Sequence, residues 1–185
     1  DPEKIVAHYT DDPRSAEILA QAIFYDQDWL DLDLGLLSDQ EAITKVCKKL
    51  PSSLHELARA IIMTWPIAII QIEAMIPIIK AIKEKGLKLI LASNASLKFY
   101  EYYRSIDALQ YFDGFLISAE IHQAKPDRCF YETLLKRFSL DQSACFMIDD
   151  KAENIEGAAR CGIDGVVFTK EIELLKTILK LKEII

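Results

Sequence analysis

Apolar residues in the first 68 positions recur at the spacing of helices rather than of strands. Two sets step by three or four positions, one of Ile43, Val46, Cys47 and Leu50 and one of Leu54, Leu57, Ala58, Ile61 and Ile62. Such steps place each set on one face of a helix. No run typical of a strand occurs there, and the only glycine is Gly35. Residues 1–68 are therefore predicted to form a small helical bundle.

Capping residues locate several helix starts within this bundle. Asp1-Pro2-Glu3 and Asp12-Pro13 each place a carboxylate before a proline at the first helical position. Ser38 followed by Glu41 has the pattern of a capping box, in which each side chain binds the other residue's backbone N–H.

Beyond residue 70 the pattern changes to alternating helices and short apolar runs. A helix carrying Met75, Ile76, Ile79 and Ile82 on one face is predicted to stop at Gly86. Strands are predicted at 87–92, 115–118, 144–148 and 165–168, and helices at 96–104, 127–138, 154–161 and from 170 onward. Apolar strands joined by helical crossovers indicate an α/β fold, with a parallel sheet covered by helices on both faces. The predicted domains are residues 1–68 and 69–185.

Composition and charge narrow the classes of partner. The chain has 185 residues and a formal net charge of −7. An acidic protein gains no counterion-release energy from a polyanion, so we expect neither a nucleic-acid partner nor an anionic membrane surface. The most hydrophobic stretch, residues 61–79, is interrupted by prolines and polar side chains and is not predicted to span a membrane. The four cysteines form no C-x-x-C pair, and we expect reduced thiols in a cytoplasmic protein.

Polar residues follow the predicted strands where their carboxyl ends should meet. Ser93-Asn94 comes after the first strand, Lys125-Pro126-Asp127 shortly after the second, and Asp149-Asp150 after the third. Ligands of open α/β sheets bind at this edge. The first two clusters could equally be a helix cap and a solvated loop. The adjacent carboxylates repel each other, and a bound hard cation explains them better.

These clusters resemble a known family in order and spacing. Leu-Ala-Ser-Asn (91–94), Lys-Pro-Asp (125–127) and Phe-Met-Ile-Asp-Asp-Lys-Ala-Glu-Asn-Ile-Glu-Gly-Ala (146–158) resemble motifs II, III and IV of the haloacid dehalogenase superfamily. Residues 29–42 are similar to a stretch of the helical cap in a subgroup of phosphatases that includes α-glucose-1-phosphate phosphatase. The resemblance implies that residues 1–68 are a cap on an α/β catalytic core.

The resemblance also implies roles for six residues. Ser93 would bind the transferring phosphoryl group with help from the Asn94 backbone or side chain, and Lys125 would stabilise its charge. Asp150 would ligate Mg²⁺, and Asp149 would complete the coordination or pair with Lys125. Asn154 would hold the acidic loop in shape. Ser93, Lys125 and Asp149 are the expected catalytic residues, and Mg²⁺ is the expected cofactor.

One family motif has no counterpart in the chain. The family's first motif is an apolar strand ending in a nucleophilic aspartate, which forms an aspartyl-phosphate. Asp31-Leu32-Asp33-Leu34-Gly35 imitates its ending but lies in the cap-like stretch, as does Asp26-Gln27-Asp28. The family's strand lies at the centre of the sheet, and its absence would leave two unpaired edges there. We therefore expect the native polypeptide to continue before Asp1.

The expected function is a Mg²⁺-dependent phosphatase acting on a small phosphorylated metabolite such as a sugar phosphate. The expected assembly is a monomer or homodimer. Alternatives are a metal-independent haloacid dehalogenase and a non-catalytic binding protein that has lost its nucleophile. A signalling receiver domain fits the order of the polar clusters badly. The lone histidines His8, His55 and His122 are predicted to be surface or helix-face residues.

Overall fold

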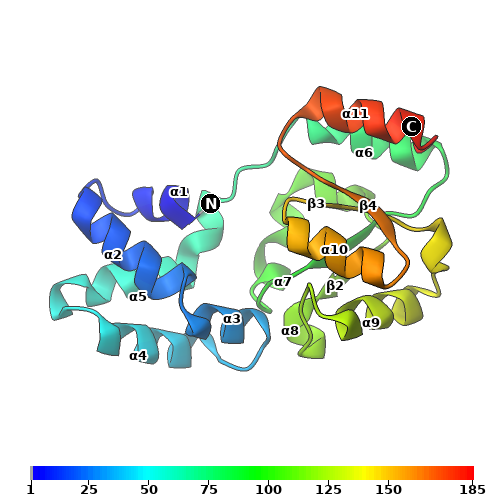
Figure 1. The fold of residues 1–185 in the computed structure, drawn as a ribbon. Coiled ribbons are helices and arrows are strands. Elements are labelled where there is room, and N and C mark those ends of the chain that lie inside the picture. The colour runs from blue at the N-terminus through cyan, green and yellow to red at the C-terminus, as the bar shows by residue number, and fades with distance from the viewer. Residues whose placement is uncertain (1) are drawn as a thin grey trace.

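The computed structural model describes residues 2–185 and begins with a bundle of helices. The bundle comprises α1 (Pro2–Ala7), α2 (Pro13–Phe24), α3 (Gln27–Asp33), α4 (Asp39–Lys49), η1 (Ser52–Leu54), α5 (His55–Thr64) and η2 (Trp65–Ala68), as Figure 1 shows. Residues 2–68 contain no strand, which confirms the helical prediction. The predicted cap at Asp1 lies outside the described residues.

The capping signals predicted in the bundle are confirmed. The Asp12 side chain accepts a hydrogen bond from the Ser15 backbone N–H at 2.9 Å. The Glu41 backbone N–H donates to Ser38 Oγ, and the Ser38 backbone N–H donates to Glu41 Oε2 at 2.8 Å. The apolar sets predicted to share a helix face pack into one core with α1 and α2 residues such as Leu19.

The second part of the chain alternates helices and strands, which confirms the α/β class. Its elements are α6 (Met75–Glu84), β1 (Ile90–Ser93), α7 (Phe99–Tyr102), η3 (Tyr103–Ser105), η4 (Asp107–Tyr111), β2 (Gly114–Ile117), α8 (Ser118–Ile121), α9 (Arg128–Phe138), η5 (Gln142–Ala144), β3 (Phe146–Asp149), α10 (Ala152–Arg160), β4 (Asp164–Val167) and α11 (Ile172–Leu181). Residues 69–74, between the bundle and α6, contain no helix or strand.

The helix predicted over residues 96–104 is wrong in extent. Residues 94–96 form no helix, and the segment narrows to one turn, α7, followed by η3. The reason is tertiary: the side chain of Lys98 is only 3% exposed and pairs with Asp39 of α4 at 2.7 Å. Contacts with the bundle therefore override the helical pattern of the local sequence.

The strands form two separate parallel sheets of two strands each, β1 with β2 and β3 with β4. Ser93 is opposite Ile117 in the first sheet, and Asp149 is opposite Val167 in the second. Within residues 2–185, no ladder joins β1 to β3. In the described residues the strands thus form two separate pairs and not the single parallel sheet that the sequence predicts.

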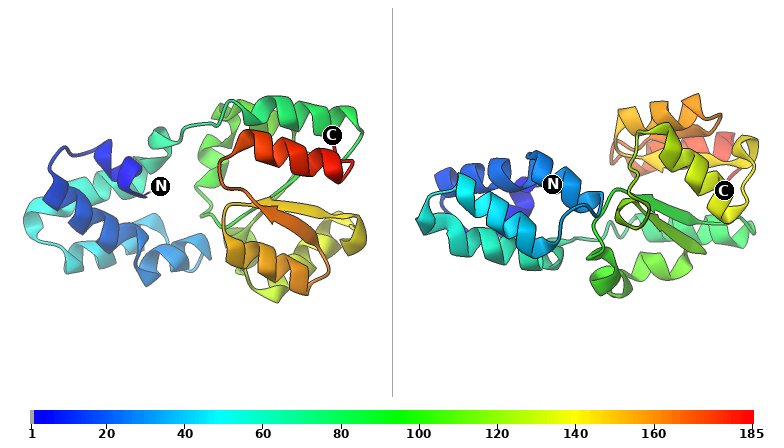
Figure 2. Two further views of the ribbon diagram at one scale, coloured as in Figure 1. Left: turned by 45° about the horizontal axis from the view of Figure 1, so that its top comes forward. Right: turned by 90° about the horizontal axis from the view of Figure 1, so that it is seen from below.

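Helices cover both faces of the strands. Phe146 and Ile148 of β3 pack toward α6 and α11, whereas Met147 packs toward α9 and α10. Alternation of this kind is the geometry of a strand buried on both faces. Figures 1 and 2 show α6 and α11 side by side over one face and α9 and α10 on the opposite face. Among the described residues, no helix is long and apolar enough to cross a membrane.

Candidate active site

The split between the two sheets is bridged at the carboxyl ends of β1 and β3 by Lys125. Its ammonium donates to the Ala92 carbonyl of β1 at 2.7 Å and to Asp149 Oδ2 of β3 at 2.6 Å. The side chains of Lys125 and Asp149 are 8% and 6% exposed. A charge-assisted hydrogen bond out of water therefore joins two clusters that the sequence predicted to meet.

The loop that carries Lys125 is held in place by Asn94. The Asn94 amide donates to the Lys125 carbonyl at 2.8 Å, and Asn94 Oδ1 accepts the Lys125 backbone N–H at 2.9 Å. The family resemblance implies that Asn94 helps to bind the phosphoryl group, through either its backbone or its side chain. Because the side chain binds the Lys125 backbone, its backbone is the part left to serve that role.

The Asp149 carboxylate accepts three hydrogen bonds. Its Oδ1 accepts the Lys151 backbone N–H and the Asn154 side-chain amide, each at 2.9 Å. Burial by itself pushes the pKa of Asp149 upward and is the largest single influence. The hydrogen bond and charge of Lys125, with the two other donors, outweigh it and bring the pKa below its ordinary value. Asp149 is therefore a fixed anion.

Tyr131 of α9 fixes the helix that supplies Asn154, and the sequence analysis missed it. Its hydroxyl donates to the Asn154 carbonyl at 2.6 Å, and its side chain is completely buried. A Cβ added at Gly157 would lie 2.7 Å from the Pro126 carbonyl oxygen and 2.8 Å from the Tyr131 hydroxyl. Gly157 was visible as part of the 146–158 motif, whereas Tyr131 gave no signal beyond an apolar helix face.

Ser93 and Asp150 remain available for a ligand. Within residues 2–185, the Ser93 hydroxyl makes no hydrogen bond, and the exposed Asp150 carboxylate has neither an ion pair nor a hydrogen bond. The described part of the chain contains no group of three or more acidic, histidine or cysteine side chains placed so that it could hold a metal ion. Carboxylate oxygen suits Mg²⁺, so Asp150 fits as one ligand. Asp149 already accepts three hydrogen bonds and fits better as the partner of Lys125.

The helical bundle reaches the same edge of the sheets through the end of α3. Ser118 Oγ donates to the Asp33 carbonyl at 2.5 Å and accepts the Ala95 backbone N–H at 2.9 Å. His122 Nδ1 donates to the Leu34 carbonyl at 2.8 Å, so this histidine contributes to the contact between bundle and core. Ser118 and His122 are separated from their partners by 85 and 88 positions, which explains why no local pattern revealed them.

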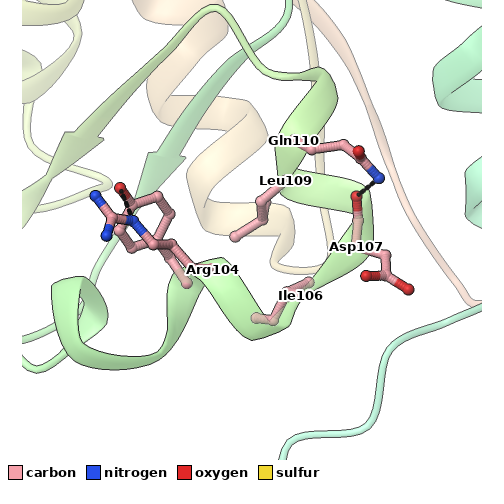
Figure 3. A pocket seen from close by; sticks show the side chains of 6 residues that line it. Arg104, Ile106, Asp107, Leu109 and Gln110 are labelled. Atoms are coloured by element: carbon pink, nitrogen blue, oxygen red, sulfur yellow. Dashed lines mark hydrogen bonds between the residues drawn. The ribbon is translucent and has the colours of Figure 1, made fainter.

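The two pockets described in the structure lie away from these residues. Figure 3 shows one of about 210 Å³ lined by Tyr103, Arg104, Ile106, Asp107, Leu109 and Gln110. The other, of about 330 Å³, lies between the 66–73 segment and Tyr102. Neither contains Ser93, Lys125 or Asp149, and neither is the candidate active site.

Comparison with known families agrees with the geometry. The profile of a family described as haloacid dehalogenase-like hydrolases matches residues 69–162, which include the strand-end residues Ser93, Lys125 and Asp149. The chain belongs to the haloacid dehalogenase-like hydrolases. The phosphatase subgroup predicted from the sequence is supported by a relative, sesquiterpene phosphatase astK from Aspergillus oryzae. It is 27% identical over 112 residues, which cover 60% of this chain and 56% of the relative.

Solved structures of other haloacid dehalogenase-like proteins share the fold. The family enzyme bt-2542 of Bacteroides thetaiotaomicron has a TM-score of 0.61 at 19% identity over 85% of both chains. It has also been crystallised with magnesium and inorganic phosphate. A dehalogenase has a TM-score of 0.72 at 15% identity, and the match covers 92% of this chain and 80% of that chain. The chain thus spans about half the length of its curated relative but most of these structures.

Proposed function

We propose that this hydrolase is a Mg²⁺-dependent phosphatase of a small phosphorylated metabolite. The observation that carries the proposal is the buried ammonium of Lys125, bound to Ala92 and Asp149 at the carboxyl ends of β1 and β3. An ammonium fixed beside an anion-binding edge stabilises negative charge without moving during reaction. The phosphatase relative and the magnesium and phosphate bound to bt-2542 favour the same chemistry.

Each residue at the edge has a defined task in this proposal. Ser93 donates its free hydroxyl to a phosphoryl oxygen, and Lys125 offsets the charge on the phosphoryl group. Asp149 holds the Lys125 side chain in position through the 2.6 Å bond. Asn154 and Tyr131 hold Asp149 and α10 in register.

Asp150 is the proposed metal ligand of this chain. Asp150 is exposed and directly follows Asp149, whose carboxylate accepts three hydrogen bonds. Mg²⁺, when bound, would neutralise phosphoryl charge and help to align the reacting oxygens.

The nucleophile is proposed to lie on a strand between β1 and β3, contributed by a segment outside these 185 residues. The aspartates that imitate its motif fit the role poorly, because they belong to α3 or its cap. Asp28 is 7% exposed and pairs with Lys45 and Lys49 of α4. In the proposed reaction a carboxylate oxygen attacks phosphorus, the ester oxygen leaves and takes a proton, and water then hydrolyses the acyl phosphate. Residues 1–68 serve as the cap, and residues 69–185 form the catalytic domain.

The substrate is proposed to be a monophosphate such as a sugar phosphate. The name of the relative from Aspergillus oryzae makes a sesquiterpene phosphate the second candidate. Metal-independent cleavage of a carbon–halogen bond is the competing reaction, and it does not require Asp150 as a metal ligand.

A phosphatase assay on the native full-length polypeptide tests the proposal. We expect Mg²⁺-dependent hydrolysis of p-nitrophenyl phosphate, and we expect Lys125→Ala and Asp150→Ala each to lower kcat/KM by about 100-fold or more. Lys136→Ala, at an exposed position of α9, is the matched control and should retain wild-type activity. Circular dichroism would verify folding. Full activity in both site variants would refute the assignment.

If the full-length protein is folded but inactive toward every phosphate ester, the non-catalytic binding protein becomes the better description. If it releases halide from 2-haloacids without metal, the dehalogenase alternative is correct.

A further inference from the structure

The bundle presents one carboxylate, that of Asp33, to the loops that carry the candidate site. The Asp33 backbone is fixed by the 2.5 Å bond from Ser118 Oγ, and the next residue, Leu34, is fixed by His122. Gly35 then passes so close to α8 that a Cβ would lie 2.5 Å from the Ala119 carbonyl oxygen. Asp33 therefore stands at a rigid point of the contact between bundle and core.

The loops that follow β1 and β3 each contribute one group that interacts with the Asp33 carboxylate. The Ser96 backbone N–H hydrogen-bonds to it and the Lys151 ammonium attracts it, and both lower the Asp33 pKa. Ser96 is three residues beyond Ser93, and Lys151 directly follows Asp150. Apart from the Ser96 N–H, no group in residues 2–185 hydrogen-bonds to the Asp33 carboxylate or pairs with it. Its remaining acceptor sites are free.

Two buried polar groups lack hydrogen-bond partners among the described residues, and one of them lies on the loop beside Asp33. Ser96 is 6% exposed, and its hydroxyl has no hydrogen-bond partner among the described residues. The indole N–H of Trp65 is likewise buried without a described partner, and its ring lies 5.6 Å from that of Tyr102. Burial, and after it the charge of Asp33, raise the pKa of Tyr102 to about 12. Buried polar groups are normally hydrogen-bonded, so the unpaired Ser96 hydroxyl beside Asp33 indicates a place for a polar ligand.

The protonation state of Asp33 determines which leaving groups can bind beside it. Burial raises the pKa of Asp33 to about 7, with Ser96 and Lys151 opposing the rise. Near neutral pH this carboxyl group can accept or donate a hydrogen bond. A second anionic group on the substrate would be repelled by the charged form, and a purely hydrocarbon group would leave the polar atoms unpaired.

We propose that Asp33 is a specificity-determining residue, which hydrogen-bonds a hydroxyl of a neutral, hydroxylated leaving group whose phosphate is held at Ser93 and Lys125. Tyr102 lies beside it and completes the polar side of this subsite. The inference rests on the proposed phosphatase function and narrows its substrate class to sugar-like or polyol monophosphates.

The test compares three kinds of substrate on the full-length enzyme. The hydroxylated substrates are glucose 1-phosphate and glycerol 3-phosphate. The second kind is p-nitrophenyl phosphate, whose leaving group has no additional hydroxyl, and the third is farnesyl phosphate, a C15 isoprenyl monophosphate. Asp33→Leu should lower kcat/KM for the preferred hydroxylated substrate by about tenfold or more relative to p-nitrophenyl phosphate, and Asp33→Asn by less. Asp31→Asn, in the same helix and hydrogen-bonded to Gln27, should keep the wild-type ratio.

Equal losses on hydroxylated and non-hydroxylated substrates in both Asp33 variants would overturn the inference, because they would mark a structural role. A wild-type preference for farnesyl phosphate that increases in Asp33→Leu would also overturn it and assign an apolar leaving group. If wild type hydrolyses no p-nitrophenyl phosphate, the proposed function fails instead. In that case, calorimetric binding of glucose 1-phosphate tests the inference. The affinity for glucose 1-phosphate should fall in Asp33→Leu and stay at the wild-type value in Asp31→Asn. Equal affinity in the two variants would refute the inference.

Discussion

At the scale of single residues, the candidate site depends on a lysine and an aspartate that are buried together. Asp149 stays ionised out of water because Lys125, Asn154 and the Lys151 backbone all donate to it. Removing one partner of such a pair exposes the desolvation cost of the other. The Lys125–Asp149 pair should therefore influence stability as well as catalysis.

Lys125→Met should destabilise the protein in a pH-dependent way. The folded-state pKa of Asp149 lies below its ordinary value of 3.8, so the stabilisation is present above about pH 4 and is lost as pH falls through the folded pKa. In the variant, Asp149 lacks its cation, and the free energy of unfolding at pH 7 should drop by about 3 kcal/mol. Near pH 3 the difference should shrink, because protonation neutralises the unpaired carboxylate.

Urea denaturation of wild type and Lys125→Met at pH 7 and pH 3 measures this effect. Lys136→Met, at an exposed position of α9, should differ from wild type by less than about 0.5 kcal/mol at both pH values. A deficit of the same size at both pH values would show that the lysine acts through packing alone.

At the scale of elements, apolar periodicity and capping residues were enough to find the helices and the strands. Ser38 with Glu41 marks the start of α4, and four apolar runs mark the four strands. The boundaries shifted where tertiary contacts intervene. Strand β1 begins only at Ile90, because the Leu89 backbone N–H is taken by the Asp113 side chain at 2.7 Å.

Gly157 of α10 provides a test of element packing. In an exposed helix interior, Gly→Ala is stabilising by about 1 kcal/mol. Here the added methyl would meet the Pro126 carbonyl and the Tyr131 ring, so Gly157→Ala should instead destabilise by about 2 kcal/mol. Thermal unfolding should show a lower Tm, whereas Glu156→Ala at the exposed neighbouring position should leave Tm nearly unchanged. A Tm above wild type would contradict the tight contact between α9 and α10.

The site was predictable to the extent that its residues follow strands. Lys125 and Asp149 were found in that way, whereas Asn154 came from the resemblance to the family motif, and the structure joins the three by hydrogen bonds. Asp33 and Ser118 could not be assigned to the site, because their contact joins a helix of the bundle to a strand end 85 positions away. Local sequence carries no signal of such a contact.

At the scale of the whole molecule, two bodies with separate cores meet through hydrogen bonds, an ion pair and a contact between the Trp65 and Tyr102 rings. The bundle core and the clusters around the strands share no buried residue in the described chain. Lys98 of the α/β part reaches into the bundle, pairing with Asp39 and donating to the Met63 carbonyl at 3.1 Å. This buried lysine is the strongest charged link between the two bodies.

Lys98→Met should loosen the two bodies without unfolding either one. Asp39 and the Met63 carbonyl would lose their cation, and the 69–74 connection would open more often. Limited proteolysis with an endoproteinase specific for glutamate should cut after Glu73 several-fold faster than in wild type. Lys85→Met, at an exposed position, is the control and should be cut at the wild-type rate. Equal cleavage rates in Lys98→Met and wild type would show that the contact does not depend on this pair.

The hydroxyl of Ser118 lowers the free-energy cost of separating the bundle from the α/β part. It carries one hydrogen atom, yet two carbonyl oxygens lie within reach: Asp33 at 2.5 Å and Ala95 at 3.2 Å. When the bundle is docked, the proton points across the boundary; when the bundle departs, a rotation of the hydroxyl about its C–O bond redirects the proton to Ala95. The side chain loses no hydrogen bond in either state, so movement between them leaves no orphaned donor behind.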